Sequence, residues 1–210
     1  MNDGPLRLIE DARALGVTLG EQQAQRLLRL LDELARWNRT YNLTSISTRD
    51  GMISGHLLDS LAAAPFLQGT LIADVGTGAG FPGLPLAIAE PQRQFTLIDS
   101  VAKKIRFVTH AVRTLAIANV TPVQSRVETL APVQPFDTVL ARAYATLADL
   151  LGSVQGVCGP GTRVIALKGL YPHDELAEIP AGWRLEQAQR VHVPGLTAER
   201  HILSLVPQPA

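Results

Sequence analysis

The pattern of apolar and polar residues divides the chain near Gly69. Before this point, apolar residues recur every three or four positions, as in the stripe formed by Leu27, Leu31 and Leu34. This spacing is typical of amphipathic helices. It predicts helices over residues 5–16, 21–39 and 48–66. We therefore expect residues 1–68 to form a helical extension that packs on the rest of the chain.

After Gly69, short apolar runs alternate with helical segments. These runs predict seven strands, over residues 71–75, 95–100, 120–124, 137–142, 162–168, 183–193 and 201–207. Strands that alternate with helices favour a mostly parallel sheet with helices on both faces. Only a short loop containing Pro194 and Gly195 separates the last two runs, which predicts an antiparallel pair at the sheet edge. We expect residues 69–210 to form one doubly wound α/β domain.

Charge and cysteine content narrow the class of protein. The chain has 19 basic and 19 acidic residues, so a nucleic-acid partner would have to meet a local basic patch. The single cysteine, Cys158, excludes an internal disulfide framework and fits a reducing cytosol. The five histidines show no metal-ligand spacing, so we predict no metal. Because no long apolar segment or signal peptide is visible, we expect a cytoplasmic protein without membrane attachment.

A glycine-rich loop follows the first predicted strand, in the sequence IADVGTGAGFPG over residues 72–83. Gly76, Gly78 and Gly80 let the chain turn tightly and bring a ligand against bare main chain. In an open α/β sheet, such a loop lies at the carboxyl edge, where ligands bind. The segment 78–83 also spells G-x-G-x-x-G, the dinucleotide-binding fingerprint. A nicotinamide-binding dehydrogenase or a non-catalytic nucleotide sensor is therefore one interpretation of the loop.

Two acidic residues bear on the identity of the cofactor. Asp99 ends the second predicted strand, 21 residues after Gly78, where a carboxylate would bond ribose hydroxyls. NAD and S-adenosylmethionine both carry a ribose, so Asp99 does not separate them. Asp74 precedes the loop, and its carboxylate would repel a pyrophosphate but suits a ligand with an ammonium and a sulfonium cation. The alternative for Asp74 is that it caps the amides of the loop.

The segment after the third predicted strand supports the same cofactor. The main-chain N–H of Val127 and the carboxylate of Glu128 lie where doubly wound folds read a nucleoside base. They would bond the ring nitrogens and the exocyclic amine of adenine. Alternatively, Glu128 is a solvated residue in a first helical turn, where the helix dipole favours an acid.

Nine short blocks in order along the chain carry a family resemblance. They are Trp37-Asn38, Tyr41-Asn42-Leu43-Thr44, His56-x-x-Asp59-Ser60, DVGTGAGFPGLPL, LIDS with Lys103-Lys104, QSRVE, Arg142-Ala143, Ala166-Leu167-Lys168-Gly169 and Glu199-Arg200-His201. In these blocks the chain resembles the bacterial 16S ribosomal RNA guanine-N7 methyltransferases, the glucose-inhibited division protein B family. The resemblance implies a class I methyltransferase with a Rossmann-like, mostly parallel seven-stranded sheet, an antiparallel C-terminal strand and a helical N-terminal extension.

The resemblance also implies the reaction and the cofactor residues. The family transfers the methyl group of S-adenosylmethionine to N7 of guanine 527 in 16S ribosomal RNA, within the small subunit or an assembly intermediate. We expect a monomer. Carried over by position, the cofactor-contacting residues are Gly76, Phe81, Val127, Glu128 and Arg142. With the residues argued from the loop itself, the predicted cofactor site also includes Asp74, Gly78 and Asp99. A class I methyltransferase with another acceptor is the alternative.

Residues at the strand ends bear on the mechanism. The fourth strand ends in Ala141-Arg142-Ala143-Tyr144, without the Asn/Asp-Pro-Pro-aromatic stretch with which amino-methylating enzymes hold an exocyclic amine. Guanine N7 already carries a free lone pair, so in-line transfer needs positioning and no general base. We expect Arg142 to supply that positioning at the junction of cofactor and substrate. A surface ion pair is its alternative role.

Basic residues elsewhere are candidates for RNA phosphates. Lys103 and Lys104 open the predicted helix after Asp99, and Lys168 and Arg200 lie at strand ends. Solvated or structural roles are the alternatives. His56 and Asp59 are three residues apart on one helical face, which favours a structural pair over a contact to the cofactor domain.

Overall fold

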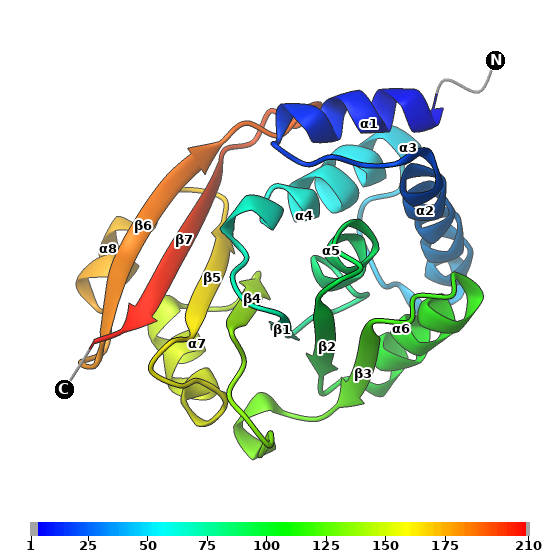
Figure 1. Cartoon of the computed structure of the whole chain (residues 1–210). Helices are drawn as coiled ribbons and strands as arrows, with labels where there is room; N and C mark the ends of the chain where they lie inside the picture. Colours follow the sequence, from blue (N-terminus) through cyan, green and yellow to red (C-terminus); the bar gives the residue numbers. More distant parts are fainter. Residues whose placement is uncertain (1–3, 209–210) are drawn as a thin grey trace.

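The structure is a computed structural model that describes residues 4–208. Its centre is one seven-stranded sheet with the strand order β3-β2-β1-β4-β5-β7-β6 (Figure 1). The strands are β1 (Leu71–Val75), β2 (Gln94–Asp99), β3 (Val120–Gln124), β4 (Thr138–Arg142), β5 (Arg163–Lys168), β6 (Trp183–Val191) and β7 (Arg200–Pro207). Strand β7 is antiparallel to both β5 and β6, and the other pairs are parallel. The predicted fold class is confirmed.

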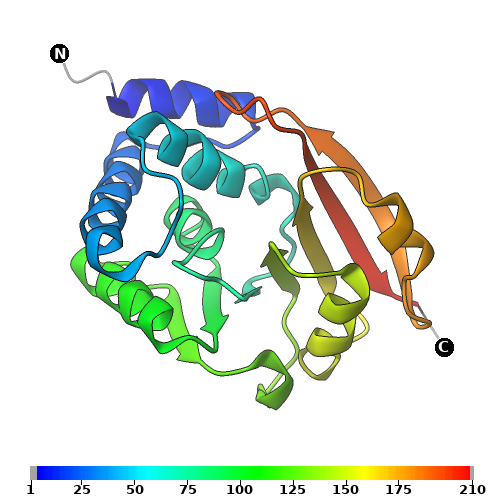
Figure 2. The same cartoon turned by 180° about the vertical axis from the view of Figure 1, so that it is seen from behind.

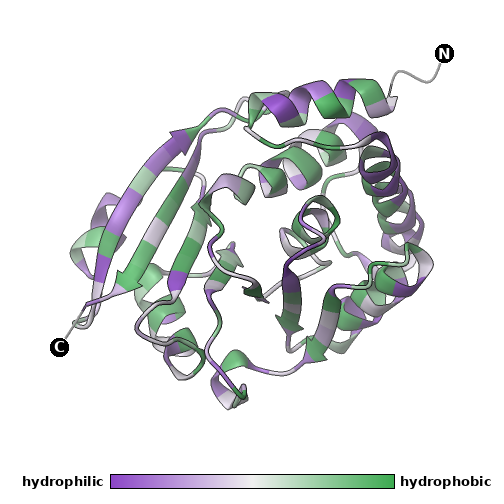
Figure 3. Cartoon of the chain, viewed as in Figure 1, coloured by the Kyte–Doolittle hydropathy of each residue, from purple (hydrophilic) through white to green (hydrophobic). Residues whose placement is uncertain are grey.

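Alternate residues of each strand point into two different cores. In β1, Ile72 faces the first core and Ala73 faces the second. The first core is covered by the helical extension with α5 (Gly83–Ala89) and α6 (Ala102–Thr114). The second is covered by α7 (Leu147–Val154), η4 (Gln155–Val157) and α8 (His173–Ala177), on the opposite side of the sheet (Figures 1 and 2). Strand β6 mixes hydrophilic and hydrophobic positions, whereas β5 and β7 are mostly hydrophobic (Figure 3).

The helical extension shares the first core. It begins with α1 (Gly4–Ala14) and α2 (Glu21–Tyr41). Leu27 and Leu31 of α2 are fully buried in one continuous apolar cluster with Leu84 and Leu86 of α5. Burial of such leucine side chains stabilises the fold by about 1.5–3 kcal/mol each. The extension and the sheet are therefore packed around common side chains.

The third predicted helix, over 48–66, differs from a single α-helix. It consists of α3 (Arg49–Met52), a π-helical segment η1 (Ile53–Leu58) and α4 (Asp59–Leu61), followed by the short 3₁₀ turn η2 (Ala64–Phe66). Regular helix ends at Leu61 because Pro65 has no N–H to donate to the carbonyl four residues earlier. None of the helices within residues 4–208 has the length and apolar character of a membrane span.

Candidate functional site

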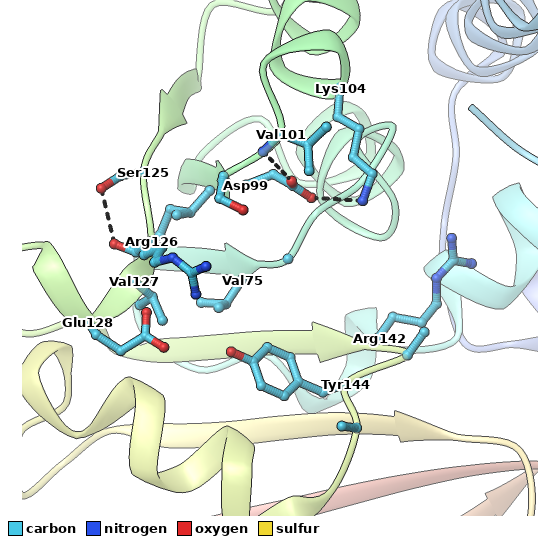
Figure 4. A pocket seen from close by; sticks show the side chains of 15 residues that line it. Val75, Asp99, Val101, Lys104, Ser125, Arg126, Val127, Glu128, Arg142 and Tyr144 are labelled. Carbon is cyan, nitrogen blue, oxygen red and sulfur yellow. Dashed lines mark hydrogen bonds and ion pairs between the residues drawn. The ribbon is translucent and has the colours of Figure 1, made fainter. Parts of the chain in front are cut away.

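A cavity of about 360 Å³ opens at the carboxyl ends of β1, β2 and β4. This first cavity lies where ligands bind in open α/β sheets, and its volume is in the range of ligand pockets. The predicted residues Gly76, Asp99, Val127, Glu128 and Arg142 all contribute to its lining. In Figure 4, Glu128 and Arg142 lie at opposite sides of the view, with Tyr144 between them and Asp99 above.

Asp99 holds the wall of the first cavity together. Its side chain is 5% exposed. One carboxylate oxygen accepts hydrogen bonds from the N–H of Gly78 in the glycine loop (2.9 Å) and, at 3.4 Å, from Lys104 Nζ. The other accepts from the N–H of Val101 (2.9 Å). Asp99 therefore ties the glycine loop to the start of α6 and also presents a charged edge to the cavity.

Asp74 lies beneath the glycine loop, fully buried and outside the cavity lining. Its Oδ2 accepts hydrogen bonds from Thr77 Oγ1 (2.6 Å) and the N–H of Gly83 (2.8 Å). Burial raises the pKa of Asp74 to about 6, against the opposing effect of these hydrogen bonds. Asp74 therefore caps an amide at the end of the glycine loop, which was the alternative to a cofactor contact. The structure does not support the predicted contact between Asp74 and a cofactor.

Gly78 and Phe81 also lie outside the cavity lining. The Gly78 N–H points to Asp99, and the Phe81 side chain is buried. The Phe81 ring stacks on His56, with 4.8 Å between ring centroids, and Arg142 Cζ lies 5.9 Å from its centroid. The structure thus places Phe81 behind the site, as support for His56 and Arg142, where the sequence predicted a direct cofactor contact.

A second cavity, also of about 360 Å³, adjoins the first. Both linings include Arg142 and Ala143, at the end of β4. The second cavity is also lined by residues of the helical extension, among them His56 and Asp59, and by the predicted RNA contacts Lys168 and Arg200. The two cavities therefore meet at the residue that the sequence predicts as the positioning group.

The basic residues of the site differ in how they are neutralised. Arg142 pairs with the buried Asp59 (3.2 Å), and Arg200 pairs with the same carboxylate (2.6 Å). Lys168 Nζ lies 2.9 and 2.8 Å from the two carboxylate oxygens of Glu175, which offsets its charge. Lys168 and Arg200 are therefore parts of a cavity wall, which weakens their predicted role as free phosphate contacts.

His56 and Asp59 do not bond each other, contrary to the favoured interpretation of their spacing. His56 Nε2 lies 2.8 Å from Thr44 Oγ1, and Nδ1 is buried without a partner among residues 4–208. Asp59 bonds Arg142 and Arg200 of the cofactor domain. Asp59 therefore follows the second interpretation of the spacing, a contact to the cofactor domain. Burial, and then the charge on Arg142, lower the pKa of His56 to about 4.

The lowered pKa of His56 makes stability depend on pH. At pH 5 the unfolded chain protonates a histidine with its ordinary value of 6.5, whereas folded His56 stays neutral. Stability therefore falls as the pH drops from 6.5 towards 4, by about 2 kcal/mol between pH 7 and pH 5. Urea unfolding at both pH values should show the wild type losing about 2 kcal/mol more than His56→Gln, since the opposing effect of the raised pKa of Asp74 is common to both proteins and cancels. The exposed His192→Gln is the control. Equal losses in all three proteins would contradict the account.

Sequence reasoning missed several residues of the first cavity. Tyr144 lines it two residues after Arg142, and its Oη lies 3.0 Å from Ser153 Oγ. Lys104, predicted for RNA, also lines this cavity. The position of Tyr144 just past a strand end was the available signal.

Solved structures of methyltransferases share this fold. The chain matches magnesium protoporphyrin IX methyltransferase from Synechocystis with bound S-adenosylmethionine at a TM-score of 0.58 and 18% identity, over 91% of this chain and 99% of the other. It matches TrmN from Thermus thermophilus at 0.56 and 18%, over 74% and 53%. At these identities the likeness shows the fold, which is that of the class I methyltransferases.

Sequence relatives define the family. The chain is 49% identical to the ribosomal RNA small subunit methyltransferase G of Methylococcus capsulatus, over 92% of this chain and 94% of the relative. It is 44% identical to the protein of that name from Escherichia fergusonii, over 95% of both. The family model GidB, rRNA small subunit methyltransferase G, matches residues 23–203. The chain belongs to this family, which confirms the resemblance.

Proposed function

We propose that the protein transfers the methyl group of S-adenosylmethionine to N7 of guanine 527 in 16S ribosomal RNA. The observation that carries the proposal is the meeting of two cavities at the end of β4, in a chain of the rRNA small subunit methyltransferase G family. One cavity would hold the methyl donor and the other the acceptor base. Arg142 belongs to both linings and would align the two reactants.

The first cavity fits the donor. Asp99 presents a carboxylate edge for the ribose hydroxyls, and Glu128 is an exposed acid at the opposite end for the adenine amine. Val127, which is 3% exposed, would supply its main-chain N–H to the adenine ring. Gly76 has a φ of +68°, so the main chain turns there without a side chain between loop and ligand. When bound, the donor supplies an electrophilic methyl group on a sulfonium.

The second cavity fits an acceptor that needs no deprotonation. Guanine N7 attacks with its own lone pair, and the electrons of the carbon–sulfur bond go to sulfur. His56 is neutral at physiological pH because its pKa is about 4. Asp59 and Lys168 are held in ion pairs. The chain's contribution is to hold N7 in line at roughly 3–3.5 Å from the methyl carbon.

The start of α6 is the proposed contact for the RNA backbone. Lys103 Nζ donates to the carbonyl of Tyr41 (3.0 Å), and Arg106 lies over the Tyr41 ring at 6.0 Å from its centroid. Lys104, next to them, reaches the rim of the first cavity. These cations would meet phosphates beside the target guanine. We propose that the protein acts as a monomer in the cytoplasm, on the small subunit or an assembly intermediate.

Thermal unfolding with added ligands tests the choice of donor. S-adenosylhomocysteine at 100 times its Kd should stabilise the protein by about 2.7 kcal/mol, which is about 5–10 °C in Tm for a chain of this size. NAD at the same concentration should give no shift, because loop amides that would bind a pyrophosphate are already taken: the N–H of Gly78 donates to Asp99 and that of Gly83 to Asp74. A shift with NAD and none with S-adenosylhomocysteine would favour the dehydrogenase alternative.

A further inference from the structure

We infer that Asp59, in the helical extension, is a positioning residue for methyl transfer. Its carboxylate fixes Arg142 and Arg200 as one wall of the second cavity, and the extension thereby completes the active site. This inference rests on the proposed function, because it assigns the second cavity to the acceptor guanine.

The geometry at Asp59 is that of a bridge between two strands. Oδ1 accepts from Arg200 Nε at 2.6 Å, and Oδ2 accepts from Arg142 Nη1 at 3.2 Å. Arg142 ends β4 and Arg200 begins β7, and β5 lies between these strands in the sheet. No backbone ladder connects them directly. The Asp59 side chain, which is 5% exposed, therefore sets the relation between the two guanidinium groups.

The π-helical segment adds a second acceptor for Arg142. The N–H of Asp59 donates to the carbonyls of Ser54 and His56. In a regular α-helix this N–H would donate to the carbonyl of Gly55. Here the Gly55 carbonyl accepts a hydrogen bond from Arg142 Nη1 at 3.2 Å. Arg142 Nη1 thus donates to two groups of the same helical turn, the Gly55 carbonyl and the Asp59 carboxylate. Short π-helical segments of this kind are frequent at functional sites.

The charges explain what the bridge does for the reaction. One carboxylate between two guanidinium groups leaves a net positive wall beside the guanine, able to donate to O6 or to a phosphate oxygen. An arginine has five N–H donors, and in residues 4–208 only Nη1 of Arg142 bonds to protein groups. Removal of the Asp59 charge leaves two like charges in a half-buried wall, which then separate. A displacement of about 1 Å at a reacting centre can lower the rate about 100-fold.

Single-turnover methyl transfer tests the inference. The substrate is small ribosomal subunits from cells that lack the methyl group. We expect Asp59→Asn to lower the transfer rate about 30-fold or more and to change the Kd for S-adenosylhomocysteine much less than the rate, because Asp59 reaches the first cavity only through Arg142. Asp59→Glu, which keeps the charge, should recover part of the rate. Asp32→Asn is the matched control, since Asp32 lies in the same extension and pairs with Arg49 (2.8 Å) at the surface.

The outcomes separate the two proposals. If the wild type transfers methyl to guanine and folded Asp59→Asn matches it in rate, the positioning role is wrong and the proposed function stands. If the wild type transfers nothing, the proposed function itself fails. Should Asp59→Asn unfold, Arg200→Gln removes the other end of the bridge. A wild-type rate in that variant would overturn the inference, whereas a slower rate with unchanged S-adenosylhomocysteine binding would support it.

Discussion

Replacement of Arg142 by methionine should lower the rate of methyl transfer to small ribosomal subunits by about 100-fold to 1,000-fold, the usual effect of removing one well-placed donor from an active site. Arg142 lines both cavities, and its guanidinium is held by Asp59 and Gly55. Methionine keeps much of the apolar length and removes every donor. Lysine should rescue little, since a single ammonium does not reproduce the planar fork of donors.

Arg163→Met is the matched control for this experiment. Arg163 is also a half-buried, ion-paired strand residue, with 26% side-chain exposure against 22% for Arg142. It lies at the start of β5 and pairs with Glu186 (2.8 Å), at the opposite end of that strand from the site. Methyl transfer should stay near the wild-type rate in this variant. A folded Arg142→Met protein within threefold of wild type would remove Arg142 from the mechanism.

Gly76→Val should abolish donor binding, with at least a 100-fold rise in the Kd for S-adenosylhomocysteine. Gly76 has a φ of +68°, a conformation in which a β-branched residue is strongly disfavoured. A Cβ at this position would lie 3.8 Å from the Tyr144 ring, so the added methyl groups would fill the cavity at the end of β1. Isothermal titration gives the affinity, and circular dichroism checks the fold.

Gly161→Val controls for the cost of valine in a turn. Gly161 does not have a positive φ, and a Cβ there would meet no atom within 4 Å. The affinity of the Gly161→Val variant for S-adenosylhomocysteine should equal that of the wild type. If Gly76→Val bound the ligand as tightly as Gly161→Val, the first cavity would not be the donor site.

Much of the fold was predictable because its signals are local. The central strands β1, β4 and β5 are short apolar runs buried on both faces, and the glycine loop follows the first of them directly. The positions of Asp99, Val127 and Glu128 follow from the same regularity, since the carboxyl ends of parallel strands share one edge of a sheet. The structure places all three in the lining of the first cavity.

The burial of Asp74 could not be predicted from its position beside the glycine loop alone. Side chains alternate along a strand, so Asp74 shares the face of Ile72, which packs into the first core beneath α5. Its carboxylate therefore turns inward to Thr77 and Gly83. Proximity to the glycine loop in sequence gave no information about that direction.

The bridge at Asp59 had no local signal. Asp59 precedes Arg142 by 83 residues and Arg200 by 141. The i,i+3 spacing of His56 and Asp59 on a regular helix favoured a pair, but the π-helical segment alters the helix geometry there. Contacts of such long sequence separation arise only when the extension packs on the sheet.

The acceptor base is tested most directly by nucleoside mass spectrometry of 16S ribosomal RNA from cells that lack this protein. We predict that 7-methylguanosine at position 527 is absent, returns when the wild-type chain is expressed, and does not return with Arg142→Met at equal protein levels. Undiminished 7-methylguanosine at that position in the cells without the protein would contradict the proposed function.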